Sequence, residues 1–132
     1  MTASGFAMSE SAYSWQFQPA VQQLRAEGRG PSFGAWCTIL HCRINILRRS
    51  SHPDWSPEQS DTVHWWINSR LDAHGEPPVP FVRCWVLDKV DIYQFFARKG
   101  RDQGIRDHAD GWLDALRALW RRYVPEEGRT NA

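Results

Sequence analysis

Hydrophobic residues recur at helical spacing along most of the chain, and the segment from Pro31 to Arg49 carries the strongest such pattern. At 100° per residue, one apolar stripe about 100° wide runs along it; its members are Phe33, Trp36, Cys37, Leu40, Ile44 and Leu47. A second apolar stripe lies roughly opposite and consists of Ala35, Ile39, Cys42 and Ile46. We predict a central helix over 32–50 that needs cover on two sides.

Helix start signals predict one further helix before this segment and one after it. The first begins at Pro19 and ends before Gly28, because proline is tolerated in the first helical turn. The second follows Ser56-Pro57-Glu58-Gln59, where serine is the N-cap and the glutamine occupies the capping-box position. It reaches about Ala73, and its predicted buried stripe is Val63, Trp66, Ile67 and Leu71.

Two more helices are expected in the C-terminal half. Asp88 is a suitable N-cap for a helix over 89–99, with an apolar face of Ile92, Phe95 and Phe96. After a charged loop over 101–109, Asp110 is the expected N-cap of a last helix over 111–123.

The segment 81–87 is nearly all apolar, and its type is uncertain from the sequence. It is too short for periodicity to separate a buried strand from a helix. No second strand is evident, which favours a short helix beginning at Pro80. The predicted fold is therefore all-α, a compact bundle of about five helices in one domain over 15–124, with disordered tails at 1–14 and 125–132.

Composition narrows the classes of function. The chain has 132 residues and a formal net charge of +1, which gives no support to a dominant nucleic-acid or membrane-surface role. Its three cysteines form no CxxC motif, so neither a disulfide framework nor a zinc site is indicated. No apolar run approaches a membrane span, and the N-terminus lacks a secretory pattern. We expect a cytoplasmic protein.

Side chains that often carry chemistry are present, but without a recognisable arrangement. Cys37 and His41 have the i, i+4 spacing of two metal ligands, and nothing in the spacing supplies the remaining ligands. The cysteines lie in apolar surroundings that make a thiol inert. Acidic residues sit at helix starts or on solvated faces, where they stabilise the helix. We therefore expect no catalytic residue, no metal and no cofactor.

Arginines gather at the ends of two predicted helices. Arg48 and Arg49 end the central helix, and Arg121 and Arg122 end the last one. A small DNA-binding regulator that places one helix in a major groove is thus an alternative. Pairing of these arginines with the helix dipole is the simpler interpretation, and nucleic-acid binding is disfavoured.

The surplus apolar surface indicates a protein-binding role. Trp65 lies on an otherwise acidic helix face, and Arg43 is flanked by apolar stripes, where it needs a carboxylate or a partner. Eight tryptophans add to this, since tryptophan is enriched at interface hot spots. The predicted interface, in a homodimer or with a partner, consists of Ala35, Ile39, Cys42, Arg43, Ile46 and Trp65.

The function that fits is a non-enzymatic regulator that binds and inhibits another protein through a helical apolar and aromatic surface. An antiactivator that sequesters a transcription regulator is one example. An immunity protein or a phage-encoded inhibitor is a further alternative, because each acts by covering a surface of its target.

Overall fold

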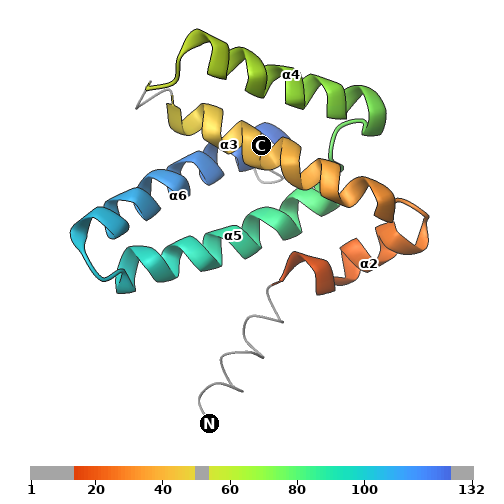
Figure 1. The fold of residues 1–132 in the computed structure, drawn as a ribbon. Coiled ribbons are helices and arrows are strands. Elements are labelled where there is room, and N and C mark those ends of the chain that lie inside the picture. Colours follow the sequence, from red (N-terminus) through yellow and green to blue (C-terminus); the bar gives the residue numbers. More distant parts are fainter. Residues whose placement is uncertain (1–13, 50–53, 126–132) are drawn as a thin grey trace.

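The computed structural model of the protein describes residues 14–49 and 54–125, most of which are helical (Figure 1). In these ranges no strand occurs, and the elements in chain order are η1 (Trp15–Phe17), α2 (Pro19–Ala26), η2 (Gly30–Ser32), α3 (Phe33–Arg49), α4 (Pro57–His74), α5 (Val79–Lys99) and α6 (Gln103–Tyr123). The predicted all-α fold with five packed helices is confirmed. The segments predicted as tails lie outside the described residues, except for Ser14 and Pro125.

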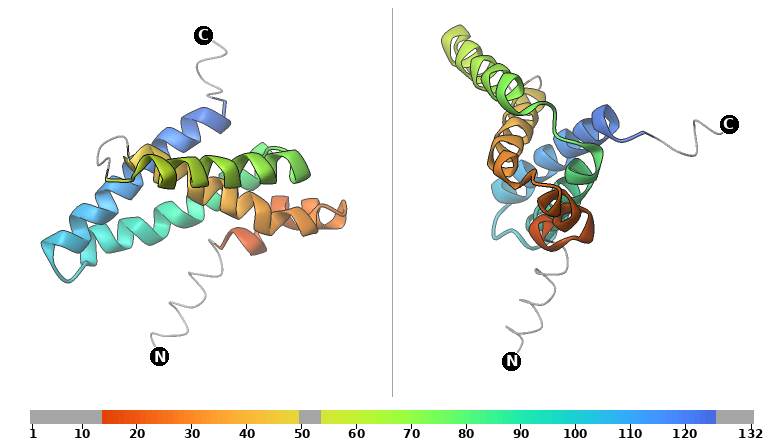
Figure 2. Two further views of the ribbon diagram at one scale, coloured as in Figure 1. Left: turned by 45° about the horizontal axis from the view of Figure 1, so that its top comes forward. Right: turned by 90° about the vertical axis from the view of Figure 1, so that its right-hand side faces the viewer.

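The central helix α3 has neighbours on both sides, as its two apolar stripes require. One side packs against α4 and the other against α6, while α5 and α6 form an antiparallel hairpin (Figures 1 and 2). The short elements η1 and α2 pack against the first half of α5. The molecule therefore has α4 on one side of α3 and the α5–α6 hairpin on the other.

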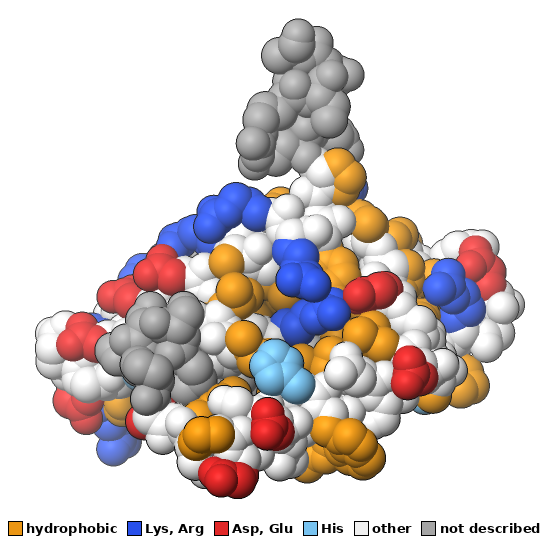
Figure 3. Space-filling view, turned by 90° about the horizontal axis from the view of Figure 1, so that it is seen from above, with side chains coloured by type: hydrophobic (Ala, Val, Ile, Leu, Met, Phe, Trp, Pro, Cys, Tyr) orange, Lys and Arg blue, Asp and Glu red, His pale blue; other side chains and the backbone are white. Residues whose placement is uncertain are grey.

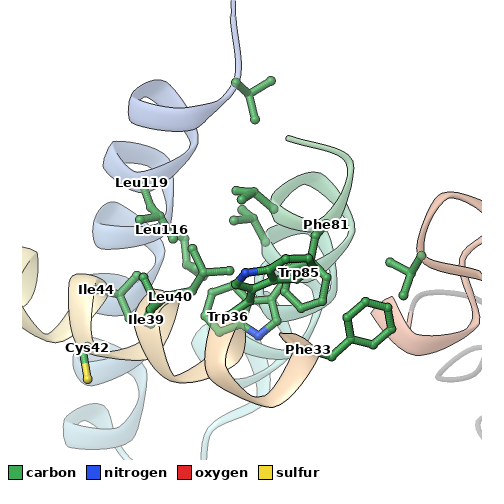
Figure 4. Packing of buried hydrophobic residues seen from close by; sticks show 14 of the residues in the cluster. Phe33, Trp36, Ile39, Leu40, Cys42, Ile44, Phe81, Trp85, Leu116 and Leu119 are labelled. Carbon is green, nitrogen blue, oxygen red and sulfur yellow. The ribbon is translucent and has the colours of Figure 1, made fainter. Parts of the chain in front are cut away.

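An aromatic cluster forms the core where α3 crosses the start of α5 (Figure 4). The ring centroid of Phe81 lies 5.1 Å from that of Trp36 and 5.3 Å from that of Phe33. Trp15 closes the cluster from η1, with its centroid 5.1 Å from Phe81. Towards the other end of α3, aliphatic residues of α3 and α6 continue the core; they are Ile39, Leu40, Ile44, Leu116 and Leu119.

The helix ends with clear local signals lie close to where the sequence places them. Ser56 Oγ accepts a hydrogen bond from the Gln59 amide at 3.1 Å, and the Ser56 amide donates to Gln59 Oε1 at 2.8 Å. This reciprocal capping box starts α4. Gly75 ends α4 with a φ of 74°, a backbone conformation that favours glycine. The predicted start of this helix is thus confirmed.

The prediction of two separate elements before residue 100 is wrong, because α5 runs without a break from Val79 to Lys99. The apolar segment 81–87 is its first half, and Asp88 lies inside the helix instead of capping it. The Asp88 carboxylate makes no capping hydrogen bond there and instead forms an ion pair with Lys89 Nζ at 3.4 Å. The nearly continuous apolar run arises because α2, η1 and α6 pack against α5, and because rings of α3 contact Phe81 and Trp85 in this half of it.

The prediction that the last helix starts after Asp110 is also wrong, since α6 begins at Gln103. Its N-cap is Asp102, whose carboxylate accepts a hydrogen bond from the Ile105 amide at 2.9 Å. Gln103 Nε2 donates to Asp107 Oδ1 at 2.7 Å, one turn further along. The segment that reads as a charged loop is therefore the first two turns of an exposed helix.

Candidate protein-binding surface

The second apolar stripe of α3 lies mostly against the chain's own helices. Ile39 is fully buried and Cys42 is 7% exposed, and both belong to the hydrophobic core. Ile46 is partly buried and packs against that core, and Ala35 is partly buried. Ile39 and Cys42 therefore have their cover within a single chain, which leaves little of the stripe for a partner.

Arg43 binds a carboxylate, one of the two fates that its position allows. Its guanidinium lies 2.7 Å from Glu76 Oε1 and donates to the Tyr123 hydroxyl oxygen. That hydroxyl in turn donates to Glu76 Oε1 at 2.7 Å. Arg43 thereby joins α3 to the α4–α5 connection and to the end of α6, a structural role within the chain.

Trp65 is exposed, as its position among acidic residues predicts. It is 65% exposed, the largest value among the large hydrophobic side chains of the described residues. The predicted burial of Trp66 is wrong, since 43% of that side chain is exposed. Only Ile67 of α4 is fully in the core, because α4 lies at one edge of the molecule and packs against α3 (Figure 2, right).

A hollow of about 300 Å³ lies between α4 and α6, with α3 as its floor. Figure 3 shows basic and histidine side chains over the middle of this face, and acidic and hydrophobic ones along its lower edge. The residues that line the hollow include Arg43, Ile46, His64 and Arg122. The lining of the hollow is thus a mixture of apolar and basic side chains, and the guanidinium of Arg43 is already paired with Glu76.

The largest group of exposed apolar side chains lies at the far end of the α5–α6 hairpin. We call it the hairpin patch and define it by four side chains that are 39–46% exposed: Ile92, Phe95, Phe96 and Ile105. The rings of Phe95 and Phe96 contact each other edge to face at 5.7 Å. Beside the patch is an open hollow of about 580 Å³ lined by Tyr93, Phe96 and Ile105, among others.

The physical origin of the hairpin patch is the length of α5. The residues Phe81 and Trp85 are fully buried, and Ile92 and Phe96 continue the same face of the helix two and three turns later. By that point α5 has passed the elements that cover its first half, and α6 covers only the side that carries Tyr93. The rings of Tyr93 and Trp112 stack there at 6.1 Å.

The sequence predicts Ile92, Phe95 and Phe96 as an apolar face, but it does not indicate that this face lies open. The usable signal is that these residues continue the apolar stripe of 81–87, once both segments are known to form one helix. The exposed position of Ile105 could not be inferred, because its segment reads as a loop.

The surroundings of the two candidate chemical groups on α3 favour the neutral form of each. Burial raises the pKa of the Cys37 thiol, and the positive charge of Lys89 offsets only part of that rise. Burial, with help from Lys89, lowers the pKa of His41, whose ring meets Trp85 edge to face at 4.8 Å. Across the described part of the chain, no three His, Cys, Asp or Glu side chains gather as metal ligands would.

Arg48, a residue of the DNA-binding alternative, lies against α6. Its guanidinium carbon is 5.8 Å from the centre of the Trp112 ring, and its Nη2 is 3.3 Å from His108 Nδ1. Gly111 makes this approach possible, since a Cβ atom there would lie only 2.5 Å from the guanidinium carbon of Arg48. The guanidinium of Arg48 therefore makes contacts within the chain and does not extend freely into solvent, as a DNA-binding side chain would.

Comparisons with known proteins add no relative. No model of a known family matches the chain, no curated protein is significantly similar to it, and no solved structure matches its fold significantly. Within 14–49 and 54–125, no helix is both long enough and apolar enough to cross a lipid bilayer.

Proposed function

We propose that the protein is a non-enzymatic regulator that uses the hairpin patch to bind another protein and to block that protein's own assembly or activity. The observation that carries the proposal is the continuous apolar face of α5, buried in its first half and exposed in its second. Exposed apolar groups that cluster in this way are typical of protein interaction sites.

The composition of the patch also fits a binding role. Two phenylalanines form its centre, and the side chains around them carry charges of both signs, such as Asp91 and Lys99. A ring of polar groups around an apolar, aromatic centre is the usual anatomy of an interface. The partner would present an apolar surface of its own, as a transcription regulator does at its assembly interface.

Protein binding is favoured over DNA binding by the state of the arginines. Arg43 is paired with Glu76, and Arg48 contacts His108 and Trp112. A groove-reading helix needs several basic side chains free to reach phosphates and bases. Arg43 and Arg48 make their contacts within the chain, so α3 does not present them in this way.

The proposal is tested by comparing two charged variants as bait in lysate of the source cells. Ile92→Glu together with Phe96→Glu should lose a partner that the wild-type chain captures, because two carboxylates would enter the apolar contact. Gln22→Glu together with Thr62→Glu adds the same charge on exposed residues of α2 and α4 and should capture normally. The captured protein, once purified, should bind wild type and not the patch variant.

Equal capture by both variants, with their helical content unchanged by circular dichroism, would contradict a role of the hairpin patch. Capture of DNA fragments with a steep loss at higher salt would favour the DNA-binding alternative.

A further inference from the structure

Two surfaces that the proposed function does not use carry opposite charges. The first is the outer face of α4, which we call the acidic face; it consists of Glu58, Asp61, Trp65 and Asp72. At 100° per residue these four side chains lie on the side of α4 opposite to the buried Ile67. All four are exposed. Among the described residues, none of the three carboxylates has an ion-pair partner.

The second surface is a groove that runs between α5 and α6 and is lined only by these two helices. We call it the hairpin groove; it has a volume of about 320 Å³ and is lined by Val86, Leu87, Val90, Leu116, Arg117, Trp120 and Arg121. Its floor is apolar, and its edge carries two arginines one helical turn apart. Leu87 is 53% exposed at the mouth, so the groove offers apolar surface that nothing in the described chain covers.

The charges of the two surfaces are opposite and similarly spaced. Glu58 and Asp61 lie one turn apart on α4, as Arg117 and Arg121 do on α6. Trp65 follows Asp61 by one more turn and projects an indole that an apolar groove of this size can receive. Arg117 already has Asp114 at 2.8 Å, but both side chains are mostly exposed, and such a surface pair is weak and exchangeable. Arg121 has no ion-pair partner among the described residues.

The two surfaces do not meet within one molecule, because α3 lies between α4 and the hairpin (Figure 2). We propose that the acidic face of one copy of the chain docks in the hairpin groove of a second copy, so that the protein associates head to tail. An interface between two different surfaces leaves one free surface of each kind at the ends, and it therefore builds a ring or an open chain of subunits. This proposal is independent of the hairpin patch and of its partner.

Variants that remove one surface each provide the decisive test by sedimentation velocity on the full chain. Trp65→Asp removes the docking side chain and keeps the groove intact. Arg117→Glu with Arg121→Glu reverses the sign of the charge at the edge of the groove and keeps the acidic face intact. Loss of a buried hot-spot contact should weaken self-association about 30-fold or more for either variant. A 1:1 mixture of the two variants should form a dimer and nothing larger, since one functional pair of surfaces remains. Phe17→Asp, at an exposed site on η1, is the matched control and should associate as wild type does.

Charge exchange gives a second readout that does not depend on the indole. Asp61→Arg should weaken self-association, and the double variant Asp61→Arg with Arg121→Glu should recover it. Higher salt should weaken the wild-type assembly, because exposed charges are screened. The proposal is overturned if wild type stays monomeric over the whole concentration series. It is equally overturned if Trp65→Asp associates as wild type does, or if the mixed variants fail to form the dimer.

Discussion

The two halves of α5 have similar hydrophobic patterns and opposite environments. In the first half, where η1, α2 and α3 contact α5, Phe81 and Trp85 are fully buried. In the second half, Phe95 and Phe96 are nearly half exposed, although the same helix presents them. The comparison teaches that the elements packed against a helix decide whether an apolar face becomes core or binding surface.

The difference follows from the lengths of the helices. Both α5 and α6 have 21 residues, whereas α3 has 17. The hairpin therefore extends beyond α3 at its closed end (Figure 1). At that end each hairpin helix packs mainly against the other, and an apolar residue that points away from the partner helix remains in contact with solvent.

The largest difference in the free energy of unfolding is expected between a charge placed at a buried apolar position and a charge placed at an exposed one. Ile39→Asp should unfold the protein, because it buries a carboxylate without a partner. Ile92→Asp, at a position that is 39% exposed, should change the free energy of unfolding by less than about 1 kcal/mol. Urea denaturation followed by circular dichroism measures both. If Ile39→Asp instead folds normally but no longer forms a dimer or binds a partner, the second apolar stripe of α3 is an interface and not core.

Removing one phenyl ring from each half of α5 is the matched form of this experiment. Phe81→Ala should lower the free energy of unfolding by about 3–5 kcal/mol, since it empties a site in the aromatic cluster. Phe95→Ala should lower it by less than about 1 kcal/mol. Similar losses for the two variants would mean that the second half of α5 is also part of the core.

The turn that closes the hairpin should tolerate little change. A Cβ atom at Gly100 would lie 2.6 Å from the Phe96 carbonyl oxygen and 2.8 Å from Ile105 Cγ2. Gly100→Ala should therefore cost about 1–3 kcal/mol of stability, as other overpacked sites do. Gly34→Ala is the control, because its Cβ would have no neighbour within 4 Å, and it should be neutral or stabilising.

The smallest effect is expected from the titration of His41. Its pKa is lower in the folded protein than in the unfolded chain, so the unfolded chain takes up a proton first as the pH falls. The free energy of unfolding should therefore decrease as the pH falls from the ordinary histidine value of 6.5 to the lower folded value. His41→Gln should reduce this pH dependence in urea titrations at a series of pH values. An unchanged slope would contradict the lowered pKa of His41 in the folded protein.

Helix ends that depend on local signals could be predicted from the sequence, whereas helix ends that depend on tertiary packing could not. The Ser56 capping box and the glycines at 28 and 75 act within one turn of the chain, so periodicity and capping rules place α2 and α4 well. Asp88 and Asp110 also resemble N-caps, but packing across the hairpin keeps both inside helices. Tertiary contacts overrode the local preference there.

The candidate site was predictable only in part, for the same reason. The exposure of Trp65 follows from its acidic neighbours on one helix, and the need of Arg43 for a carboxylate follows from its apolar flanks. The burial of Ile39 and the open end of α5 depend on how far separate helices overlap. Helix periodicity contains no information on that overlap, so the hairpin patch appears only in three dimensions.

Photo-crosslinking at Phe95 tests the central claim most directly, because this side chain is the most exposed member of the hairpin patch. A benzophenone amino acid at position 95, activated in the source cells, should give one predominant adduct with a different protein. The same group at Gln22 should give none, and Ile92→Glu should abolish the adduct at position 95. No adduct at position 95, or adducts alike at both positions, would contradict the account that the open half of α5 is a protein-binding surface.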